Sequence, residues 1–556
     1  MTIDSTQLSV DEILRLATPR SRQYFPPTDE QRAVIEAPLE PLLVVAGAGA
    51  GKTTTMSQRV LYMVAHHEIE PERILGLTFT RKAAGELGLK MRQDLGVLAS
   101  NLGRSFQGDP TALTYNSFAA RILGEYGATI GVDPDSRLIG QAQQVQILNE
   151  IVQNWRGEYP EEDGRYKPTS SIVAAVLALS GHIAEQNMTL DQGAKALRAF
   201  SEELEEIAQS AGKDPTGSLK SMIAVNANRI LLLDMARVFE DYKRSHGLID
   251  FSDQLLLATR IVTENAAVVR QVRSDYQAVL LDEFQDTSVI QMTFLSTLFA
   301  DHPTTAVGDP SQAIYGWRGA SASALSNFLT AFSTQREATQ LALSTAWRND
   351  HAILQAANAV ALPLRGLPRI GQENSTGSTS IKVPQVKPPV LGPRPQAGEG
   401  KVSASYPLTY QEELEHVVEF IRQHRVQDAK GKWNTCAVLC RRRADFPAIE
   451  RALKDADTPV QVVGLGGLLD QPSVSDVRAA LELASDPMNA PALMRLVTAM
   501  DIGAADLLVL NQYAKYRARQ GRQAEQEHPD VFLMDAIDQL PPVGWHAPSG
   551  GPSFTA

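Results

Sequence analysis

The segment VVAGAGAGKTTTM at 44–56 constrains this chain more than any other part of the sequence. It follows a short apolar run at 42–45 and is rich in small residues up to Lys52. Glycines let successive backbone N–H groups point at an anion without Cβ clashes, while a lysine reaches phosphates and a hydroxyl reaches Mg²⁺. The alternative is a glycine-rich turn that binds nothing, and Ala46 stands where the strict pattern begins with glycine. The upstream run and the Gly-Lys-Thr ending favour a phosphate-binding loop formed by Gly47, Gly49, Gly51, Lys52 and Thr53.

Further continuous apolar runs follow along the chain, and each ends at or next to a Gly, Asp or Thr residue. They are ILGLTF at 74–79, ALTY at 112–115, AVLLDE at 278–283 and TTAVGD at 304–309. Continuous runs of this kind are typical of buried parallel strands, whose carboxyl ends collect the chemistry. The sequence therefore predicts a doubly wound α/β core. The run that ends in Asp282 and Glu283 offers one carboxylate for Mg²⁺ and one to polarise a water, although paired acids at a strand end are common.

Two other regions differ from this core. Between 130 and 245, apolar residues such as Leu148 and Val152 repeat at helical spacing, which predicts a helical insertion. Another α/β unit is expected from about 336, with a strand at QLALST, a helix from Glu412 to Arg425 and strands near AVLC and PVQVV. A stretch rich in Pro, Gly, Ser and Thr at 364–404 interrupts it and predicts a flexible excursion.

Composition says more about the cellular compartment of the protein than about its binding partner. The chain has 556 residues, a net charge of −12 and 43% hydrophobic residues, which suits a large globular protein. No run is long and apolar enough to span a bilayer, so a cytoplasmic location is expected. Cys436 and Cys440 lie in a strand-like segment and are expected to be buried and reduced, without a zinc site. The negative net charge does not indicate a nucleic-acid partner, but a local basic groove would be sufficient to bind one.

Five segments occur in order: LTFTRKAAGELGLKMR at 77–92, LTYNSFAARIL at 113–123, LIDFSDQ at 248–254, DEFQDT at 282–287 and VGDPSQAIYGWRGA at 307–320. Together they resemble superfamily 1A DNA helicases of the UvrD/Rep/PcrA type. The resemblance implies a P-loop NTPase with two RecA-like domains, 1A and 2A, each interrupted by a helical insertion, 1B and 2B. The expected domains are 1A at 1–129 and 246–335, 1B at 130–245, an incomplete 2A at 336–494, and the start of 2B with a tail at 495–556.

The resemblance also implies an ATP and Mg²⁺ site. Thr53 and Asp282 would hold the metal, Glu283 would be the base, and Lys52, Gln312 and Arg348 would act on the phosphates. Gln31 corresponds to an adenine-binding glutamine, although Thr28 and Gln31 also form a helix-capping pattern. Thr54 stands where the family has an arginine, and Trp347 where it has a stacking aromatic. The expected nucleotide-binding residues are Gln31, Ala48, Gly49, Ala50, Gly51, Lys52, Thr53, Thr54 and Trp347.

For DNA, aromatic faces give sequence-tolerant holds on single strands. The resemblance assigns six residues to DNA: Phe79, Thr80, Phe251, Tyr315, Trp317 and Arg318. Without the resemblance, Phe79 and Phe251 would be predicted to be core residues rather than DNA-binding residues. Arg81, Asn116 and Gly316 depart from the family's usual asparagine, histidine and arginine.

The family's later 2A motifs have no recognisable counterpart here, so the sequence resembles a helicase truncated at its C-terminus. The expected function is an ATP-dependent 3′–5′ helicase or translocase on single-stranded DNA in repair or recombination, in a bacterial, nucleoid-associated setting. Single-stranded or partly duplex DNA and a partner helicase or nuclease subunit are the expected partners. The alternative is an incomplete motor that binds ATP and DNA as a non-catalytic or partner-dependent module.

Overall fold

The chain divides into two compact units, Met1–Val402 and Ser403–Ala556, which are described separately. The structure is a computed structural model that describes residues 5–21, 23–67, 69–133, 136–162, 165–210, 217–316, 319–321, 323–366, 386–429, 431–463, 472–485, 489–499, 504–520, 533–547 and 553.

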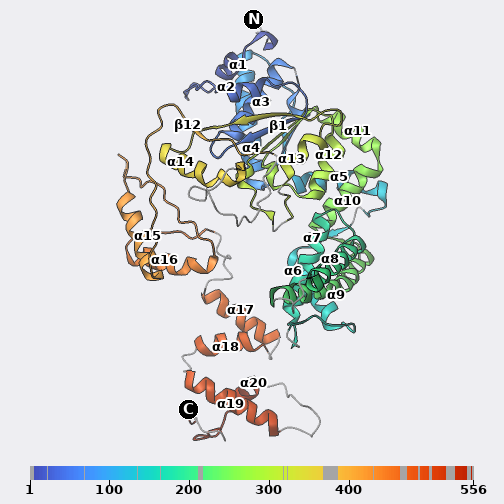
Figure 1. Cartoon of the computed structure of the whole chain (residues 1–556), viewed down its shortest axis with the longest axis vertical. Helices are drawn as coiled ribbons and strands as arrows, with labels where there is room; N and C mark the ends of the chain where they lie inside the picture. The colour runs from blue at the N-terminus through green and yellow to red at the C-terminus, as the bar shows by residue number, and fades with distance from the viewer. Residues whose placement is uncertain are drawn as a thin grey trace. The chain divides into compact units, whose positions relative to one another are not determined.

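A six-stranded parallel sheet that contains β1 organises the first unit (Figure 1). Its strands lie in the order β10-β1-β9-β8-β2-β3. The strands are β1 (Leu42–Ala46), β2 (Ile74–Thr78), β3 (Thr111–Thr114), β8 (Ala278–Leu281), β9 (Thr304–Gly308) and β10 (Thr339–Leu343). The five strands expected from the apolar runs are therefore present. Because all strands are parallel, the polar residues that follow β1, β9 and β8 meet at one edge of the sheet.

Helices cover both faces of this sheet because side chains alternate along each strand. Leu42 and Val44 of β1 pack on one core, and Leu43 and Val45 pack on the other. The first core contains α1 (Val10–Ala17), α2 (Asp29–Glu36), α3 (Lys52–His66) and α4 (Arg81–Leu102). The second contains α5 (Tyr115–Tyr126), α10 (Phe251–Glu264), α11 (Ala266–Asp275), α12 (Val289–Phe299) and α13 (Ala324–Ala331).

A buried arginine ties α3 to α2. Arg59 is 2% exposed, and its guanidinium donates to the carbonyl oxygens of Val34 (2.8 Å), Ala37 (2.8 Å) and Pro38 (3.0 Å). Burial lowers the pKa of Arg59 to about 10. The hydrogen bonds fix the end of α2 against the helix that follows the glycine-rich loop.

The helices expected between 130 and 245 form an insertion with its own core around Leu148, Val176 and Phe239. They are α6 (Gln141–Gln153), α7 (Thr169–Glu185), α8 (Leu190–Ser210) and α9 (Gly217–Ser245). At the base of the insertion, β4 (Arg137–Leu138) pairs with β7 (Leu248–Ile249). A short hairpin joins β5 (Glu161–Glu162) to β6 (Arg165–Tyr166).

An ion cluster joins this insertion to the core. Lys243, near the end of α9, is 2% exposed and lies 3.1 Å from Glu240, 2.8 Å from Asp250 and 2.7 Å from Asp253. Asp250 also caps α10 through the backbone N–H groups of Ser252 and Asp253. Burial opposes the charge of Lys243, but the carboxylates, with Asp253 first, raise its pKa above the ordinary value.

One expectation about the region after 336 is wrong. The strand at QLALST does not open a second sheet, because β10 pairs with β1 at the edge of the first sheet. An apolar run in a sequence predicts that a strand is buried, but it does not predict which other strand that strand pairs with. The predicted flexibility of the segment at 364–404 stays a prediction; in its described part, Asn358 and Arg365 bond to backbone groups at Leu391 and Pro389. Its residues 367–385 lie outside the described residues.

Short elements fix this segment to the first unit. β11 (Thr345–Ala346) pairs with β12 (Gly392–Pro393), and α14 (His351–Val360) supplies Asn358. Arg394 lies 2.8 Å from Asp350.

The described part of the second unit is helical, with α15 (Tyr410–His424), α16 (Phe446–Asp455), α17 (Pro472–Ser485), α18 (Ala490–Ala499), α19 (Ala504–Gln520) and α20 (Leu533–Asp538). α15 matches the helix expected at 412–425. The strands expected near AVLC and PVQVV are wrong, because residues 434–440 and 459–463 form no ladder with any described segment. Without a neighbouring strand the side chains stay open to solvent, so Leu439 is 94% exposed and Cys436 is exposed rather than buried. Part of the expected tail packs on α19, where the Trp545 ring lies 4.9 Å from that of Tyr513.

Candidate nucleotide and DNA site

The glycine-rich loop joins β1 to α3, and its backbone requires glycine at two positions. Gly49 has a φ of +76° and Gly51 a φ of +81°, both in the left-handed region that disfavours a Cβ. A Cβ at Gly51 would lie 3.0 Å from the Gln31 amide nitrogen. Gln31 also forms the capping box with Thr28, so its side chain both caps α2 and faces the loop.

Two residues far along the chain approach the same loop. The backbone N–H of Trp347 donates to the carbonyl of Gly49 at 2.9 Å, and a Cβ on Gly49 would lie 3.0 Å from the Cβ of Arg348. Both residues follow β11. The Trp347 indole N–H is buried without a hydrogen-bond partner. The site thus keeps one donor unused.

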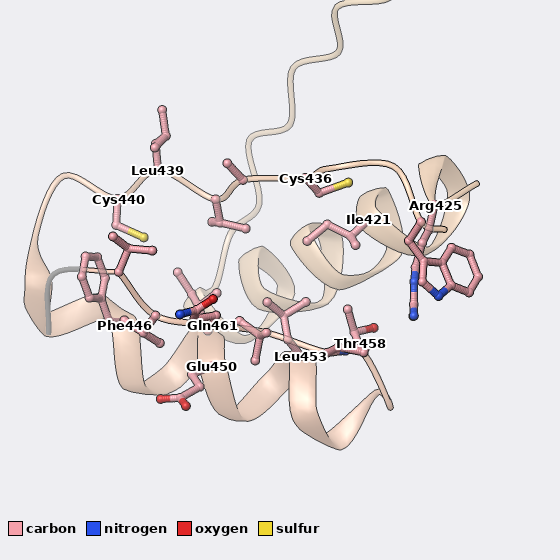
Figure 2. Close-up of a pocket in the computed structure, with 18 of the residues that line it drawn as sticks. Ile421, Arg425, Cys436, Leu439, Cys440, Phe446, Glu450, Leu453, Thr458 and Gln461 are labelled. Carbon is pink, nitrogen blue, oxygen red and sulfur yellow. The ribbon is translucent and has the colours of Figure 1, made fainter. Parts of the chain in front are cut away.

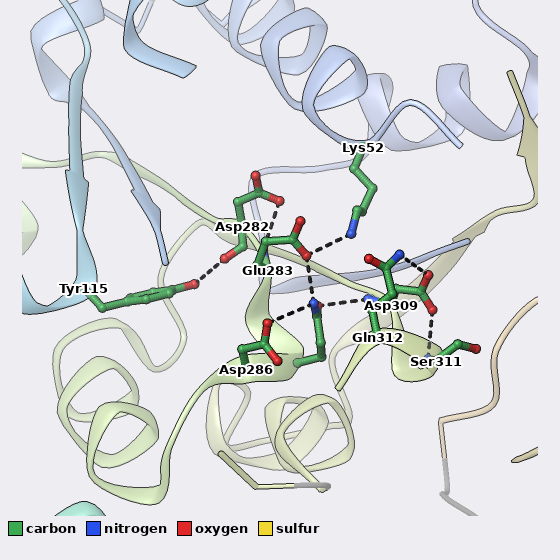
Figure 3. Close-up of polar contacts among 9 residues, drawn as sticks. Lys52, Tyr115, Asp282, Glu283, Asp286, Asp309, Ser311 and Gln312 are labelled. Carbon is green, nitrogen blue, oxygen red and sulfur yellow. Dashed lines mark hydrogen bonds and ion pairs between the residues drawn. The ribbon is translucent and has the colours of Figure 1, made fainter. Parts of the chain in front are cut away.

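The loop lysine is paired with an acid from β8. Lys52 Nζ lies 2.9 Å from Glu283 Oε2, and the same oxygen accepts a hydrogen bond of 2.7 Å from Gln285 (Figure 3). Glu283 has a φ of +50°, a left-handed conformation that is strained for a residue other than glycine. The backbone therefore holds this carboxylate toward the loop.

A second set of hydrogen bonds links β8 to β9. Gln285 Oε1 accepts from the backbone N–H of Asp309 at 3.0 Å, and Gln312 Nε2 donates to Asp309 Oδ2 at 2.7 Å (Figure 3). Gln312 ends η5 (Pro310–Gln312), which directly follows β9. A continuous chain of polar contacts therefore runs from Lys52 through Glu283 and Gln285 to Gln312.

The two neighbouring acids have opposite pKa shifts. Burial, followed by the charge of Glu283, raises the pKa of Asp282 to about 6. Burial also acts to raise the pKa of Glu283, but Lys52 and the hydrogen bond from Gln285 bring it below the ordinary value. Glu283 consequently stays ionised at neutral pH, as a general base must.

One cavity of about 420 Å³ collects most of the predicted nucleotide residues. It is lined by Gly49, Ala50, Gly51, Lys52, Thr53, Thr54, Glu283, Gln312, Trp347 and Arg348. Gln31, Ala48 and Asp282 are not among its lining residues, although Gln31 adjoins Gly51 and Asp282 precedes Glu283. The Thr53 hydroxyl and the Asp282 carboxylate are oxygen donors of the type that Mg²⁺ binds together with phosphates and water. These two residues fit a magnesium ion that is shared with a bound nucleotide.

The predicted DNA residues separate into two places. The rings of Phe79, which follows β2, and Tyr315 lie 4.9 Å apart, and both residues are partly exposed. Thr80 is exposed and caps α4 by accepting from Ala83. Phe251 is 49% exposed and lines a different cavity, beside Lys243. Trp317 and Arg318 lie outside the described residues.

Sequence reasoning missed the connecting residues Gln285, Asp286 and Asp309. DEFQDT contains Gln285 and Asp286, and VGDPSQ contains Asp309, so polar residues inside the motifs were the available signal. Asp286 is 7% exposed, and burial followed by the charge of Glu283 raises its pKa to about 6, while Lys52 and the backbone N–H of Ile314 oppose the shift.

A larger cavity, of about 590 Å³, lies in the second unit. Figure 2 shows that Ile421 of α15 and Phe446 and Leu453 of α16 line it, together with Leu439 and Thr458 of two extended segments. Its lining is mainly apolar and contains none of the predicted site residues. In the described part of the chain no group of three or more His, Cys, Asp or Glu residues could hold a metal ion.

The parallel sheet, the left-handed glycines and the acids on the neighbouring strand define a P-loop nucleotide-binding α/β protein. The family models identify it further. The UvrD/REP helicase N-terminal domain matches residues 27–333, and the UvrD-like helicase C-terminal domain matches residues 342–520. The chain belongs to the UvrD/REP helicase family.

Curated relatives are bacterial helicases. The chain is 25% identical over 485 residues to DNA helicase II of Escherichia coli strain K12, an alignment that covers 86% of this chain and 57% of that protein. It is 24% identical over 472 residues to ATP-dependent DNA helicase PcrA of Staphylococcus aureus strain Mu50, covering 84% and 55%. The chain therefore spans little more than half the length of these relatives. Among the described helices, none has the length and apolar character needed to cross a bilayer.

Proposed function

We propose that this chain is an ATP-driven DNA motor that moves 3′ to 5′ along single-stranded DNA in repair or recombination, at the bacterial nucleoid. One observation carries the proposal: a single cavity brings the glycine-rich loop together with three other parts of the chain, which supply Glu283, Gln312 and the neighbouring pair Trp347 and Arg348. Each of these residue types has a place in phosphoryl transfer, where positioning and charge do most of the work.

The residues divide the chemistry among them. Backbone N–H groups of the loop and Lys52 would bind the phosphates, and Thr53 and Asp282 would hold a Mg²⁺ ion, which would supply positive charge to neutralise the phosphates. Glu283 orients the attacking water and takes its proton. Lys52 is paired with Glu283, so a phosphate that binds Lys52 competes with this ion pair and frees the Glu283 carboxylate to act as the base. Arg348 and Gln312 contact the terminal phosphate.

The proposed coupling between ATP and DNA rests on two residues, Gln312 and Tyr315, that lie close together along the chain. Gln312 lines the nucleotide cavity, and Tyr315, three residues later, contacts Phe79. A change at the phosphate thereby alters the aromatic pair that would stack on bases. The similarity to DNA helicase II and to ATP-dependent DNA helicase PcrA supports this proposal.

The domain assignment is part of the proposal. The parallel sheet corresponds to 1A and extends through β10, eight residues beyond the boundary expected at 335, because β10 pairs with β1. The insertion formed by α6 to α9 corresponds to 1B, and the second unit to parts of 2A and 2B.

The test is the steady-state ATPase rate of the purified chain with and without single-stranded DNA. DNA should stimulate the rate, Lys52→Ala should abolish it, and Glu283→Gln should lower kcat by about 10²–10⁴-fold while nucleotide binding persists. Binding of ATP and DNA without any stimulated turnover would contradict a self-sufficient motor. That result would support the alternative of a partner-dependent binding module.

The DNA contact has its own test. Phe79→Ala should weaken single-stranded DNA binding by about 1–3 kcal/mol and leave the DNA-independent ATPase rate unchanged. Fluorescence anisotropy measures the first and phosphate release the second. The control is Phe200→Ala, which removes an exposed aromatic side chain from α8 at a position that no motif assigns to DNA.

A further inference from the structure

A small polar cavity of about 180 Å³ lies at the carboxyl edge of the sheet, beside the aromatic pair. Phe79 lines it from the end of β2, Asn116 from the start of α5 and Asp286 from η4 (Phe284–Asp286). Glu185, the last residue of α7, reaches it from the helical insertion. On the same scale one water needs about 10–15 Å³, so the cavity has room for a group of roughly ten heavy atoms.

The cavity presents unused hydrogen-bond acceptors. Asp286 is 7% exposed, and its Oδ1 is buried with no hydrogen-bond partner. Glu185 Oε2 is also buried without a partner. A buried carboxylate oxygen that lacks a donor costs free energy, and native proteins rarely leave one unexplained. These two oxygens therefore favour an occupant that brings N–H donors.

The surroundings favour a planar occupant over a metal ion. The described residues contain no group of three metal-ligating side chains, whereas the Phe79 ring lines the cavity and lies 4.9 Å from the Tyr315 ring. Nucleobases offer both a flat face for stacking and amino groups on their edges. Cytosine and adenine present an amino donor where thymine presents a carbonyl acceptor, which would face the carboxylates unfavourably.

We propose that this cavity receives one base of the bound single strand and selects bases that carry an exocyclic amino group, with Glu185 and Asp286 as the acceptors. The inference rests on the proposed DNA binding and adds a base preference to it. Because Glu185 belongs to the insertion and Asp286 to the core, an inserted base links the two. Gly319, in the loop after Gln312, packs on the same glutamate, since a Cβ there would lie 2.6 Å from the Glu185 Cβ.

The experiment compares single-stranded oligonucleotides of equal length at about pH 8, above the pKa of about 6 of Asp286. The probes are oligo(dC), oligo(dT) and an oligomer of the 2-pyrimidinone deoxynucleoside, which has the cytosine ring without its amino group. Anisotropy should show oligo(dC) binding about tenfold more tightly than oligo(dT), with the 2-pyrimidinone oligomer resembling oligo(dT). Glu185→Gln should reduce the preference to about threefold or less, while Glu203→Gln on exposed α8 leaves it unchanged.

Each contrary result has a separate meaning. Equal affinities for oligo(dC) and oligo(dT) in the unmodified protein overturn the base preference but leave DNA binding intact. An affinity for the 2-pyrimidinone oligomer equal to that for oligo(dC) shows that the amino group is not read. Failure to bind any of the three oligomers overturns the proposed function itself. The probe comparison uses the unmodified protein, so it holds even where a Glu185 variant does not fold.

Discussion

At the scale of single residues, the ionised form of Asp282 is unfavourable for folding, although it is the form that would bind a metal ion. Its pKa rises from 3.8 to about 6 in the folded chain, so the native state binds the proton more tightly than the unfolded state does. Its contribution to the free energy of unfolding therefore decreases as the pH rises through this interval. Asp282→Asn should raise the ligand-free free energy of unfolding by about 2 kcal/mol at about pH 8, and much less at about pH 4.

Urea unfolding at both pH values measures this effect, and the same variant should lose Mg²⁺-dependent ATP hydrolysis. Exposed Asp109, changed to Asn, serves as the control. A destabilised Asp282→Asn chain at the higher pH would show that the carboxylate is required for folding.

A second residue-scale prediction concerns Arg59. Arg59→Met removes a donor from four buried or part-buried carbonyl oxygens, those of Val34, Ile35, Ala37 and Pro38, while keeping the volume of the side chain. We expect a loss of about 3–5 kcal/mol in the free energy of unfolding, because several buried acceptors lose a charged donor at once. Arg92→Met on exposed α4 surface should change it by less than about 0.5 kcal/mol. Equal effects for the two variants would show that the α2 end can rearrange.

At the scale of elements, the Lys243 cluster holds α9 of the insertion to α10 of the core. Lys243→Met leaves Glu240, Asp250 and Asp253 close together without their cation, which should cost about 3–5 kcal/mol in denaturant unfolding. The neighbouring Arg244 has a side chain that is 79% exposed, and its pair with Asp241 should contribute less than about 1 kcal/mol. An Arg244→Met variant as unstable as Lys243→Met would assign the loss to α9 itself rather than to the cluster.

At the scale of the whole molecule, every residue that lines the nucleotide cavity belongs to the first unit, as do both cores of the parallel sheet. A chain ending at Val402 should therefore fold and bind a fluorescent ATP analogue within about threefold of the full chain's affinity. Titration of both proteins, with Lys52→Ala in each as the control, checks this. A much weaker shortened chain would mean that residues after Val402 take part in nucleotide binding.

The sequence by itself determined the local elements and the motif chemistry. Glycine spacing predicted the loop because left-handed backbone at Gly49 and Gly51 requires glycine. Continuous apolar runs predicted five strands because both faces of a parallel sheet are buried. Helical spacing predicted the insertion for the same reason, since burial on one face imposes a period.

Only the tertiary structure decided which segments meet. It assigned β10 to the first sheet, placed Leu391 beside Gly47, and left 434–440 without a partner strand among the described residues. It also brought Glu185 of the insertion to Asp286 of the core, which no motif relates. The physical reason is that burial and backbone conformation are encoded within a few residues, whereas pairing depends on contacts between segments far apart in the chain.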